Sequence, residues 1–398
     1  MLQRVYRQLK TVSPEADITV ATAKAQVSAI RNQLELSADV CVEPMRRDTF
    51  PAISLATAYL VDTKKIALTD YVVVCPVDPY VELDYFIAIN NLYIQACTQN
   101  ENIMLLGVKP TYPSEKYGYI IPEESANGVK RVIAFKEKPS EDIAKQYIAQ
   151  GALWNCGVFV FRVEYMIDII HQYMPFHTYH ELYQNYDKLP KVSFDYAVVE
   201  KESNIACMEF DGEWSDVGTW NTLTEKISTK CIGNVHMDDS CENTNIINEL
   251  SIPILALGVK NAVITASADG ILVSDKAASS YMKPYVDAIS HKAMFAEKSW
   301  GDLQILDETD NVITLRLALR EGTSMSTHLH KNREELWIIT HGNGIATING
   351  SSLSVQKGMS IPIPRNSYHS IKAVTPMRLI EVQMGKDLGM QDKVKLVK

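Results

Sequence analysis

The chain has 398 residues, of which 46% are hydrophobic and 22% are charged, and its formal net charge is −9. That length exceeds what one hydrophobic core usually organises, so we expect two or three domains. The negative charge argues against binding to nucleic acid or to an anionic membrane, because both would repel the average surface. No run approaches the roughly 20 apolar residues of a membrane helix. The seven cysteines include no CxxC pair and indicate reduced thiols, so we expect a cytoplasmic protein.

The chain opens with an amphipathic helical stretch, MLQRVYRQLK, that no strand precedes. Helical patterns then alternate with short β-rich runs at residues 17–23, 39–44, 71–78 and 102–110. Continuous apolar runs between helices are typical of strands that are buried on both faces. Residues 1–230 are therefore expected to form an α/β domain around a parallel sheet.

The pattern of residue types changes in the second half of the chain. Residues 231–289 consist of short β-like pieces punctuated by Asn, Ser, Asp and Gly, and they end in the helical stretch KAASSYMKPYVDAI, which predicts a small β module closed by a helix. Residues 290–398 are β-patterned, with turn signals at THGNG, INGSS and QKG. This last region predicts a small antiparallel barrel or sandwich.

Four stretches of the first half carry side chains suited to chemistry: VCPVDPY with Asp78, FKEKPS with Glu137 and Lys138, WNCGVFVF with Asn155 and Gly157, and EWSDVGTW with Asp216. Each also has a purely structural interpretation. The Asp78 carboxylate could begin a turn after a buried strand, Asp216 could cap a helix, and FKEKPS could be a solvated charge cluster.

In this order, the four stretches resemble the sugar-1-phosphate nucleotidyltransferases, and VEPMRRDTFPAISLATA at residues 42–58 narrows the likeness to mannose-1-phosphate guanylyltransferase. The resemblance continues through FDYAVVEK at 194–201 and covers essentially the whole chain. It implies a Rossmann-like domain that joins GTP and mannose 1-phosphate into GDP-mannose and pyrophosphate. A transferase for glucose 1-phosphate is disfavoured by EPMRRDTFPAI and by the C-terminal region.

The reaction brings two highly charged anions together, so a divalent metal and cations must neutralise them. The resemblance implies that Asp78 and Asp216 hold Mg²⁺, and Asp78 follows a strand at the sheet edge where open α/β folds bind ligands. It also implies that Glu137 and Asn155 hold sugar hydroxyls, while Lys138, as a catalytic residue, and Lys201 meet phosphate. The other substrate-binding positions that it implies are Glu43, Arg47, Thr49, Gly118, Gly157 and Asp195.

The family begins with a strand and a loop of the form GGxGTRLxPLS, which cradles the triphosphate, and neither precedes the opening helix here. We therefore expect a misassigned start codon or an N-terminally truncated copy, with impaired transfer. The family's first strand lies between the runs at 17–23 and 71–78. Its loss should either leave ladder groups unpaired, at about 1–3 kcal/mol each, or let those two runs pair with one another.

A second group of candidate site residues lies in EGTSMSTHLHKNREELWIITHGNG and QKGMSIPIPRNSYHSI. His328 and His330 are two residues apart, so both point to one face of a strand, and Glu335 and His369 could complete the ligand set of a divalent transition metal such as Zn²⁺.

These motifs resemble a cupin, namely the phosphomannose isomerase domain of the bifunctional type II enzymes. The segment HKNREELW is two residues longer than the family pattern, so Arg333 is not equated with the family's Arg, and Asn366 replaces a typical Gly. The resemblance implies isomerisation between fructose 6-phosphate and mannose 6-phosphate as a further activity, and it allows a homodimer. The alternative is a noncatalytic sugar-phosphate-binding protein or scaffold.

Overall fold

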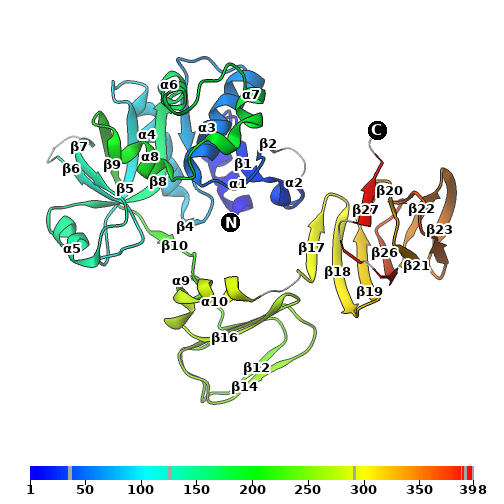
Figure 1. Cartoon of the computed structure of the whole chain (residues 1–398). Helices are drawn as coiled ribbons and strands as arrows, with labels where there is room; N and C mark the ends of the chain where they lie inside the picture. Colours follow the sequence, from blue (N-terminus) through cyan, green and yellow to red (C-terminus); the bar gives the residue numbers. More distant parts are fainter. Residues whose placement is uncertain (35–37, 124–127, 290–292, 387, 390–391, 397–398) are drawn as a thin grey trace. The chain divides into compact units, whose positions relative to one another are not determined.

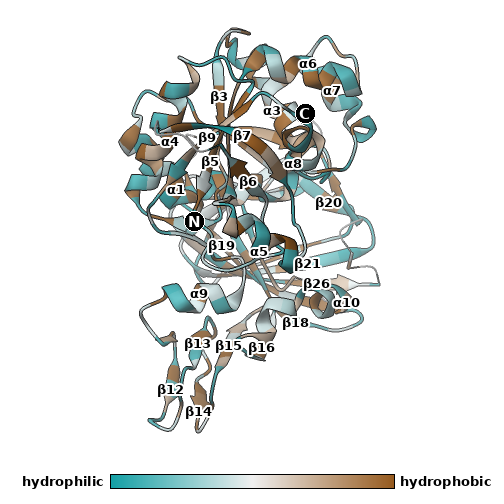
Figure 2. Cartoon of the chain, turned by 90° about the vertical axis from the view of Figure 1, so that its left-hand side faces the viewer, coloured by the Kyte–Doolittle hydropathy of each residue, from teal (hydrophilic) through white to brown (hydrophobic). Residues whose placement is uncertain are grey.

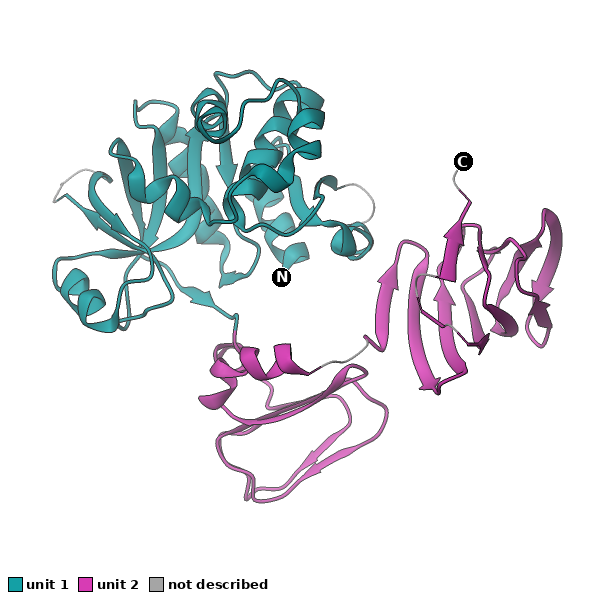
Figure 3. Ribbon diagram, in the orientation of Figure 1, with its two compact units in different colours: residues 1–218 teal, residues 219–398 magenta. Residues whose placement is uncertain are grey.

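The computed structural model describes all residues except 35–37, 124–127, 290–292, 387, 390–391 and 397–398. The chain forms two compact units, Met1–Gly218 and Thr219–Lys398 (Figure 3). The three-part division after residues 230 and 289 remains a proposal, and residue 290, where the last part is expected to begin, lies outside the described residues. Among the described helices, none is both long and apolar enough to cross a membrane.

The first unit alternates helices and strands (Figure 1). Its helices are α1 (Leu2–Val12), α2 (Val27–Gln33), α3 (Thr49–Tyr59), α4 (Leu83–Ala96), α5 (Glu141–Ala149), α6 (Val163–Tyr173), α7 (Tyr179–Gln184) and α8 (Phe194–Ala197). Its strands are β1 (Thr19–Ala23), β2 (Asp39–Glu43), β3 (Tyr71–Val74), β4 (Pro79–Val81), β5 (Ile103–Val108), β6 (Tyr119–Pro122), β7 (Val129–Lys136), β8 (Leu153–Arg162), β9 (Ile205–Phe210) and β10 (Trp214–Asp216). The predicted α/β class is confirmed.

The main sheet of this unit has the order β3-β8-β5-β9-β7-β6 and is covered on both faces. All six residues of β5 are buried, with Ile103 and Leu105 in the core beside α3 and α6, and Met104 and Leu106 in the core beside α4. Figure 2 shows the hydrophobic residues of these strands in brown. The sheet is mixed rather than parallel as we expected, because β8 runs antiparallel to β3 and β5. Burial on both faces makes a strand apolar in either direction, so composition did not reveal this.

Strands β1 and β2 form a separate, two-stranded parallel sheet. Neither pairs with β3, so of the two outcomes expected between the runs at 17–23 and 71–78, the structure shows the unpaired one. Helix α1 connects the two sheets through packing. Val5 and Leu9 of α1 join the α4 core while Leu2 and Tyr6 pack with Val20 beside α2.

The second unit begins with α9 (Trp220–Lys226), and residues 231–288 follow as a small β module. The module contains β11 (Cys231–Ile232), β12 (Val235–Met237), β13 (Asn245–Asn248), β14 (Ile254–Ala256), β15 (Ala262–Ser267), β16 (Gly270–Asp275) and α10 (Lys283–Ala288). The order β11-β13-β15-β16 is parallel except for the closing hairpin β15–β16, and β12 pairs with β14.

The C-terminal region is a cupin of two facing antiparallel sheets, as predicted. One has the order β17-β18-β19-β26-β21-β24 and the other β23-β22-β25-β20-β27. The strands are β17 (Phe295–Lys298), β18 (Gly301–Glu308), β19 (Val312–Leu319), β20 (His328–His330), β21 (Arg333–His341), β22 (Asn343–Ile348), β23 (Ser351–Gln356), β24 (Ser360–Ile363), β25 (His369–Ala373), β26 (Met377–Gly385) and β27 (Lys393–Lys395).

Candidate functional sites

The first unit contains a pocket with a volume of about 1510 Å³, larger than the 300–1,000 Å³ of a usual small-molecule site. Eight of the twelve site residues predicted in this unit line it, and four do not. The lining residues are Thr49, Asp78, Gly118, Glu137, Asn155, Gly157, Asp195 and Asp216.

The two residues predicted to hold Mg²⁺ are brought together by a short ladder. Strand β10 pairs antiparallel with β4 and places Asp216 opposite Pro79, next to Asp78. The backbone N–H of Gly218 donates to Asp216 Oδ1 over 2.8 Å, so this carboxylate has a fixed orientation. Asp216 does not cap the following helix, because Thr219 caps α9 instead.

The predicted sugar-binding residues form a connected group in the same pocket. Asn155 donates from Nδ2 to Asp195 Oδ1 over 2.7 Å, and its Oδ1 accepts from the N–H of Gly157 over 3.1 Å. Glu137 is only 6% exposed. Burial and the nearby Asp195 raise the pKa of Glu137 to about 7, while Lys138, 3.1 Å from Glu137 Oε1, opposes that rise. The group can therefore offer both donors and acceptors to hydroxyl groups.

Gly118 leaves room for this arrangement. A Cβ atom at residue 118 would lie 2.5 Å from Glu137 Oε2 and 2.8 Å from the Phe135 ring, so a larger residue would displace the carboxylate. The carbonyl of Gly118 accepts from the N–H of Asn155 over 2.8 Å. Lys138 has a φ of 46°, in the left-handed region that is uncommon for a lysine.

The four predicted residues outside the lining are Lys138 and the three described here. Glu43 accepts from the Tyr186 hydroxyl over 2.7 Å, and Arg47 donates twice to the carbonyl of Leu189. Lys201 lies 3.2 Å from the Tyr173 hydroxyl. In this conformation the side chains of Glu43 and Arg47 fix the segment around residues 186–189, and the contact roles that we expected for them remain predictions.

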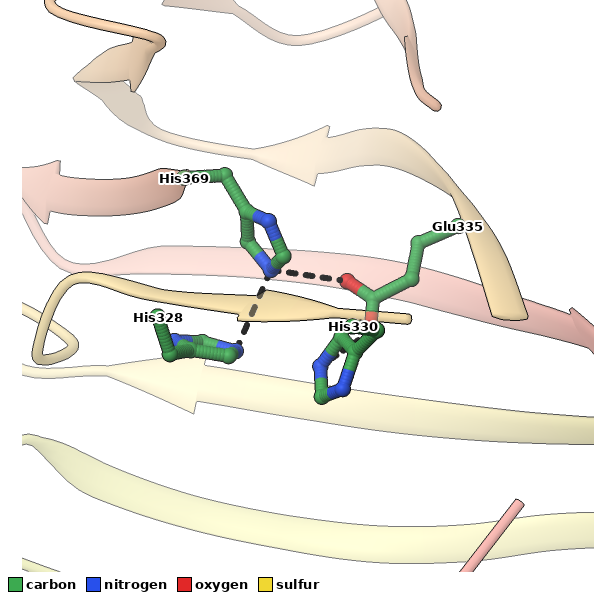
Figure 4. Close-up of side chains that lie close together, drawn as sticks. All are labelled: His328, His330, Glu335 and His369. Atoms are coloured by element: carbon green, nitrogen blue, oxygen red, sulfur yellow. Dashed lines mark hydrogen bonds and ion pairs between the residues drawn. The ribbon is translucent and has the colours of Figure 1, made fainter. Parts of the chain in front are cut away.

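The C-terminal barrel holds the second candidate site, a cluster of His328, His330, Glu335 and His369 (Figure 4). All four are buried, and one ligand atom from each lies within 4.8 Å of the others. Strands β20, β21 and β25 supply them, with His328 directly opposite His369. Glu335 is buried whereas Glu334 is exposed, so the two-residue extension keeps the expected register.

The hydrogen bonds of the imidazoles favour a cation. Nδ1 of His328 lies 2.7 Å from the carbonyl of Ser326, and Nδ1 of His369 lies 2.9 Å from that of Ser367. A carbonyl only accepts, so each Nδ1 carries the hydrogen and each Nε2 keeps a lone pair. The two Nε2 atoms are 3.1 Å apart. Facing lone pairs need a shared cation, and three imidazoles with one carboxylate suit a divalent transition metal.

The charge states agree with that donor set. Burial, Lys393 and His369 lower the pKa of His328 to about 3, which keeps the imidazole neutral. Burial alone would raise the pKa of Glu335, but the neighbouring His330 and His369 outweigh it and hold that pKa below the ordinary value. The neutral imidazole of His328 and the ionised carboxylate of Glu335 are in the states that bind metal.

Sequence reasoning assigned no role to several polar residues around this cluster, including Arg333, which it named. Asp392 accepts with Oδ1 from the N–H groups of Lys331 and Asn332, both over 3.0 Å. Arg333 is buried, and its Nη2 lies 3.3 Å from Nε2 of His330. Gln383 lies 3.4 Å from Glu335 Oε1. Alternation within a strand could have indicated that Arg333 and Gln383 point inward, whereas Asp392 carries no sequence signal.

Comparisons with known proteins agree with the families that we expected for both halves of the chain. Residues 1–231 match the family described as Nucleotidyl transferase, and residues 287–398 match the one described as Mannose-6-phosphate isomerase C-terminal. The chain is 26% identical to the mannose-1-phosphate guanylyltransferase of Escherichia coli K12, over 99% of this chain and 90% of that protein. It is 28% identical to the one of Salmonella muenchen, over 92% and 83%.

A solved structure from Thermus thermophilus, titled a mannose-1-phosphate geranyltransferase, superimposes with a TM-score of 0.61 at 26% identity. The match covers 72% of this chain and 88% of that one. The resemblance read from the sequence is thus confirmed over the whole chain.

Proposed function

Since the chain belongs to the nucleotidyl transferase family, we propose that it transfers GMP from GTP to mannose 1-phosphate and releases pyrophosphate. The observation that carries this proposal is the gathering of eight predicted site residues around one pocket. The names of the relatives supply the identity of both substrates.

Within the pocket, Asp78 and Asp216 fit Mg²⁺, because carboxylate oxygens are its preferred protein ligands and the β4–β10 ladder makes the two residues neighbours. The ion would neutralise phosphate charge during transfer. The Tyr117 hydroxyl, 3.4 Å from Asp216 Oδ2, helps to orient that carboxylate. Asn155, Asp195 and Glu137 would bind mannose hydroxyls and fix the sugar so that its phosphate faces the metal carboxylates.

We expect slow turnover by the 398-residue chain. Among the described residues that line the pocket, Lys116 is the only lysine or arginine, whereas seven are acidic. A triphosphate with about four negative charges therefore meets few cations, even with one Mg²⁺ and with Lys138 nearby. If this scarcity of cations costs about 4 kcal/mol of transition-state binding, transfer slows roughly a thousandfold. The same scarcity favours the alternative, a noncatalytic sugar-phosphate-binding protein.

For the barrel, we propose a bound divalent transition metal and isomerisation between fructose 6-phosphate and mannose 6-phosphate. The buried donor set and the match of residues 287–398 support this second activity. When bound, the metal would polarise the carbonyl oxygen while a proton moves between C1 and C2. The chain's own contribution would be to hold the donors in a dry interior.

The test of the transferase is GDP-mannose formation from GTP and mannose 1-phosphate with Mg²⁺, at high enzyme concentration. Asp78→Asn should lower the rate at least tenfold. Asp211→Asn is the matched control, because Asp211 is exposed and pairs with Lys109 outside the pocket. Equal rates for both variants would contradict the pocket as the active site. Binding of mannose 1-phosphate without any turnover would favour the noncatalytic alternative.

A further inference from the structure

Strand β27 is the last strand of its sheet and lies directly beside β20, which carries His328 and His330 (Figure 1). The ladder between the two strands is antiparallel and sets Lys393 opposite His330. Residues that face one another across an antiparallel ladder point to the same side of the sheet. Because the His330 side chain points to the other candidate metal donors, the Lys393 side chain points into the barrel as well.

The ammonium group of Lys393 forms neither a hydrogen bond nor an ion pair within the described part of the chain. Two carboxylates attract it through space, but both are engaged with other side chains. Glu335 lies 3.1 Å from Nε2 of His330. Glu381 accepts a hydrogen bond from Nε2 of Gln383. The barrel interior therefore contains a positive charge that has no direct partner in the fold.

A second interior cation, Arg333, is held by the fold itself. Its Nη1 donates to the carbonyl of Leu388 over 2.8 Å, and its Nε lies 3.9 Å from Oδ2 of Asp392. Arg333 is also only 6% exposed, whereas Lys393 is half-buried and reachable from solvent. A ligand that enters the barrel can therefore meet Lys393 without displacing an existing side-chain contact.

Lys393 lies near the candidate metal donors without belonging to them. It faces His330 across the ladder, and its charge contributes to the low pKa of His328. An ammonium group has no lone pair, so it cannot bind a metal ion while it is charged. A molecule with one end at the metal site can therefore place an anionic group against Lys393 at its other end.

We propose that Lys393 binds the phosphate group of a hexose 6-phosphate whose C1 and C2 atoms lie at the candidate metal site. The inference rests on the proposed isomerisation, which supplies the substrate class. The reaction occurs at C1 and C2, whereas the phosphate is attached to C6, so a cation outside the donor set has to meet it. A phosphate monoester carries a charge of about −1.5 to −2 at pH 7, and lysine binds phosphate as a point charge on a flexible stem.

The test uses the full chain loaded with Zn²⁺ and follows amide hydrogen exchange in β20 and β27, which reports on the barrel and not on the pocket of the first unit. Mannose 6-phosphate should slow this exchange in a saturable manner. Mannose, which lacks the phosphate, should do so only at concentrations that are higher by about tenfold or more. Equal protection by mannose, or by inorganic phosphate at the same concentration, would overturn the proposal.

A set of variants assigns the effect to one side chain. Lys393→Met removes the charge but keeps an unbranched stem, so half-maximal protection should need about tenfold more mannose 6-phosphate. Lys393→Arg keeps the charge and should retain most of the binding. Lys372→Met is the matched control and should bind like the parent, because Lys372 is exposed on β25 between two buried residues and points away from the interior. Binding by Lys393→Met that equals the parent's would refute the proposal.

Two further measurements separate phosphate binding from other roles of Lys393. The metal content of Lys393→Met should equal that of the parent, and a loss of metal would show that Lys393 supports the donors, contrary to the proposal. Isomerisation is measured in parallel. Phosphate-dependent protection that Lys393→Met weakens, in a protein that does not isomerise mannose 6-phosphate, would uphold the binding site and reject only the proposed activity.

Discussion

The two candidate sites differ in how far the surrounding sheet is completed. In the barrel, two facing sheets bury all four residues of the candidate metal site, and backbone carbonyls orient His328 and His369. In the first unit, the sheet is divided between β2-β1 and the six strands that begin with β3, and the pocket opens along that division. The comparison teaches that a site between fully paired sheets is held in place by those sheets. A site beside two unpaired strand edges depends on further contacts at those edges.

The largest effect is expected in the barrel. The double variant His328→Ala, His330→Ala should lose its bound transition metal almost completely, because two of the four donors disappear from an enclosed site. Elemental analysis of the purified protein measures this. His341→Ala is the control, since His341 is exposed on β21. Unchanged metal stoichiometry in the double variant would refute the site, and with it this side of the comparison.

A smaller effect is expected at Glu137 in the divided unit. Its folded-state pKa of about 7 lies above the ordinary 4.5, so the folded state binds more protons than the unfolded state between these values. Stability contributed by the protonated carboxyl is therefore lost as pH rises towards 7. Glu137→Gln cannot ionise, and its stability relative to the parent should rise by about 2 kcal/mol from pH 4.5 to pH 8.5, after a discount for screening.

Urea unfolding of the parent and of Glu137→Gln at the two pH values gives this difference. Glu141→Gln serves as the control, because Glu141 lies on the surface in an exposed pair with Lys145. A relative stability that does not change with pH would show that Glu137 is solvated, and that the sugar side of the pocket is less organised than its hydrogen bonds suggest.

The last effect, of similar or smaller size, concerns Gly118. Gly118→Ala should destabilise the first unit by about 1–3 kcal/mol, because the added methyl group overlaps Glu137 Oε2 and the Phe135 ring. Gly128→Ala is the matched change, since a Cβ atom there meets nothing within 4 Å. Thermal unfolding followed by circular dichroism compares them. If both variants unfold alike, the close approach at Gly118 is relieved at little cost.

Local patterns predicted much of this molecule. The spacing of His328 and His330 predicted that both side chains lie on one face of a strand, and both are buried. Glu335 is also buried, as strand alternation predicts. The Gly-to-Asn change at residue 366 is explained by backbone geometry: Asn366 has a φ of 60°, a left-handed conformation that asparagine tolerates better than most residues.

Contacts between distant segments were harder to predict. Nothing near Trp214 indicates that β10 would pair with β4, far earlier in the chain, and bring Asp216 beside Asp78. The direction of β8 was also hidden, since a strand buried on both faces has the same apolar composition in either orientation. Asp392, near the C-terminal end of the described chain, accepts a hydrogen bond from the N–H of Lys331 in the barrel. A single polar residue there gives no periodic signal.

The position of the described chain ends bears on how the protein should be handled at the bench. Strand β27 (Lys393–Lys395) pairs directly with the strand that carries His328 and His330, so a C-terminal polyhistidine tag would sit beside the metal donors and could bias metal measurements. Leu2 and Val5 of α1 line the pocket of the first unit, so an N-terminal tag could reach it. A cleavable tag that is removed before measurement avoids both effects.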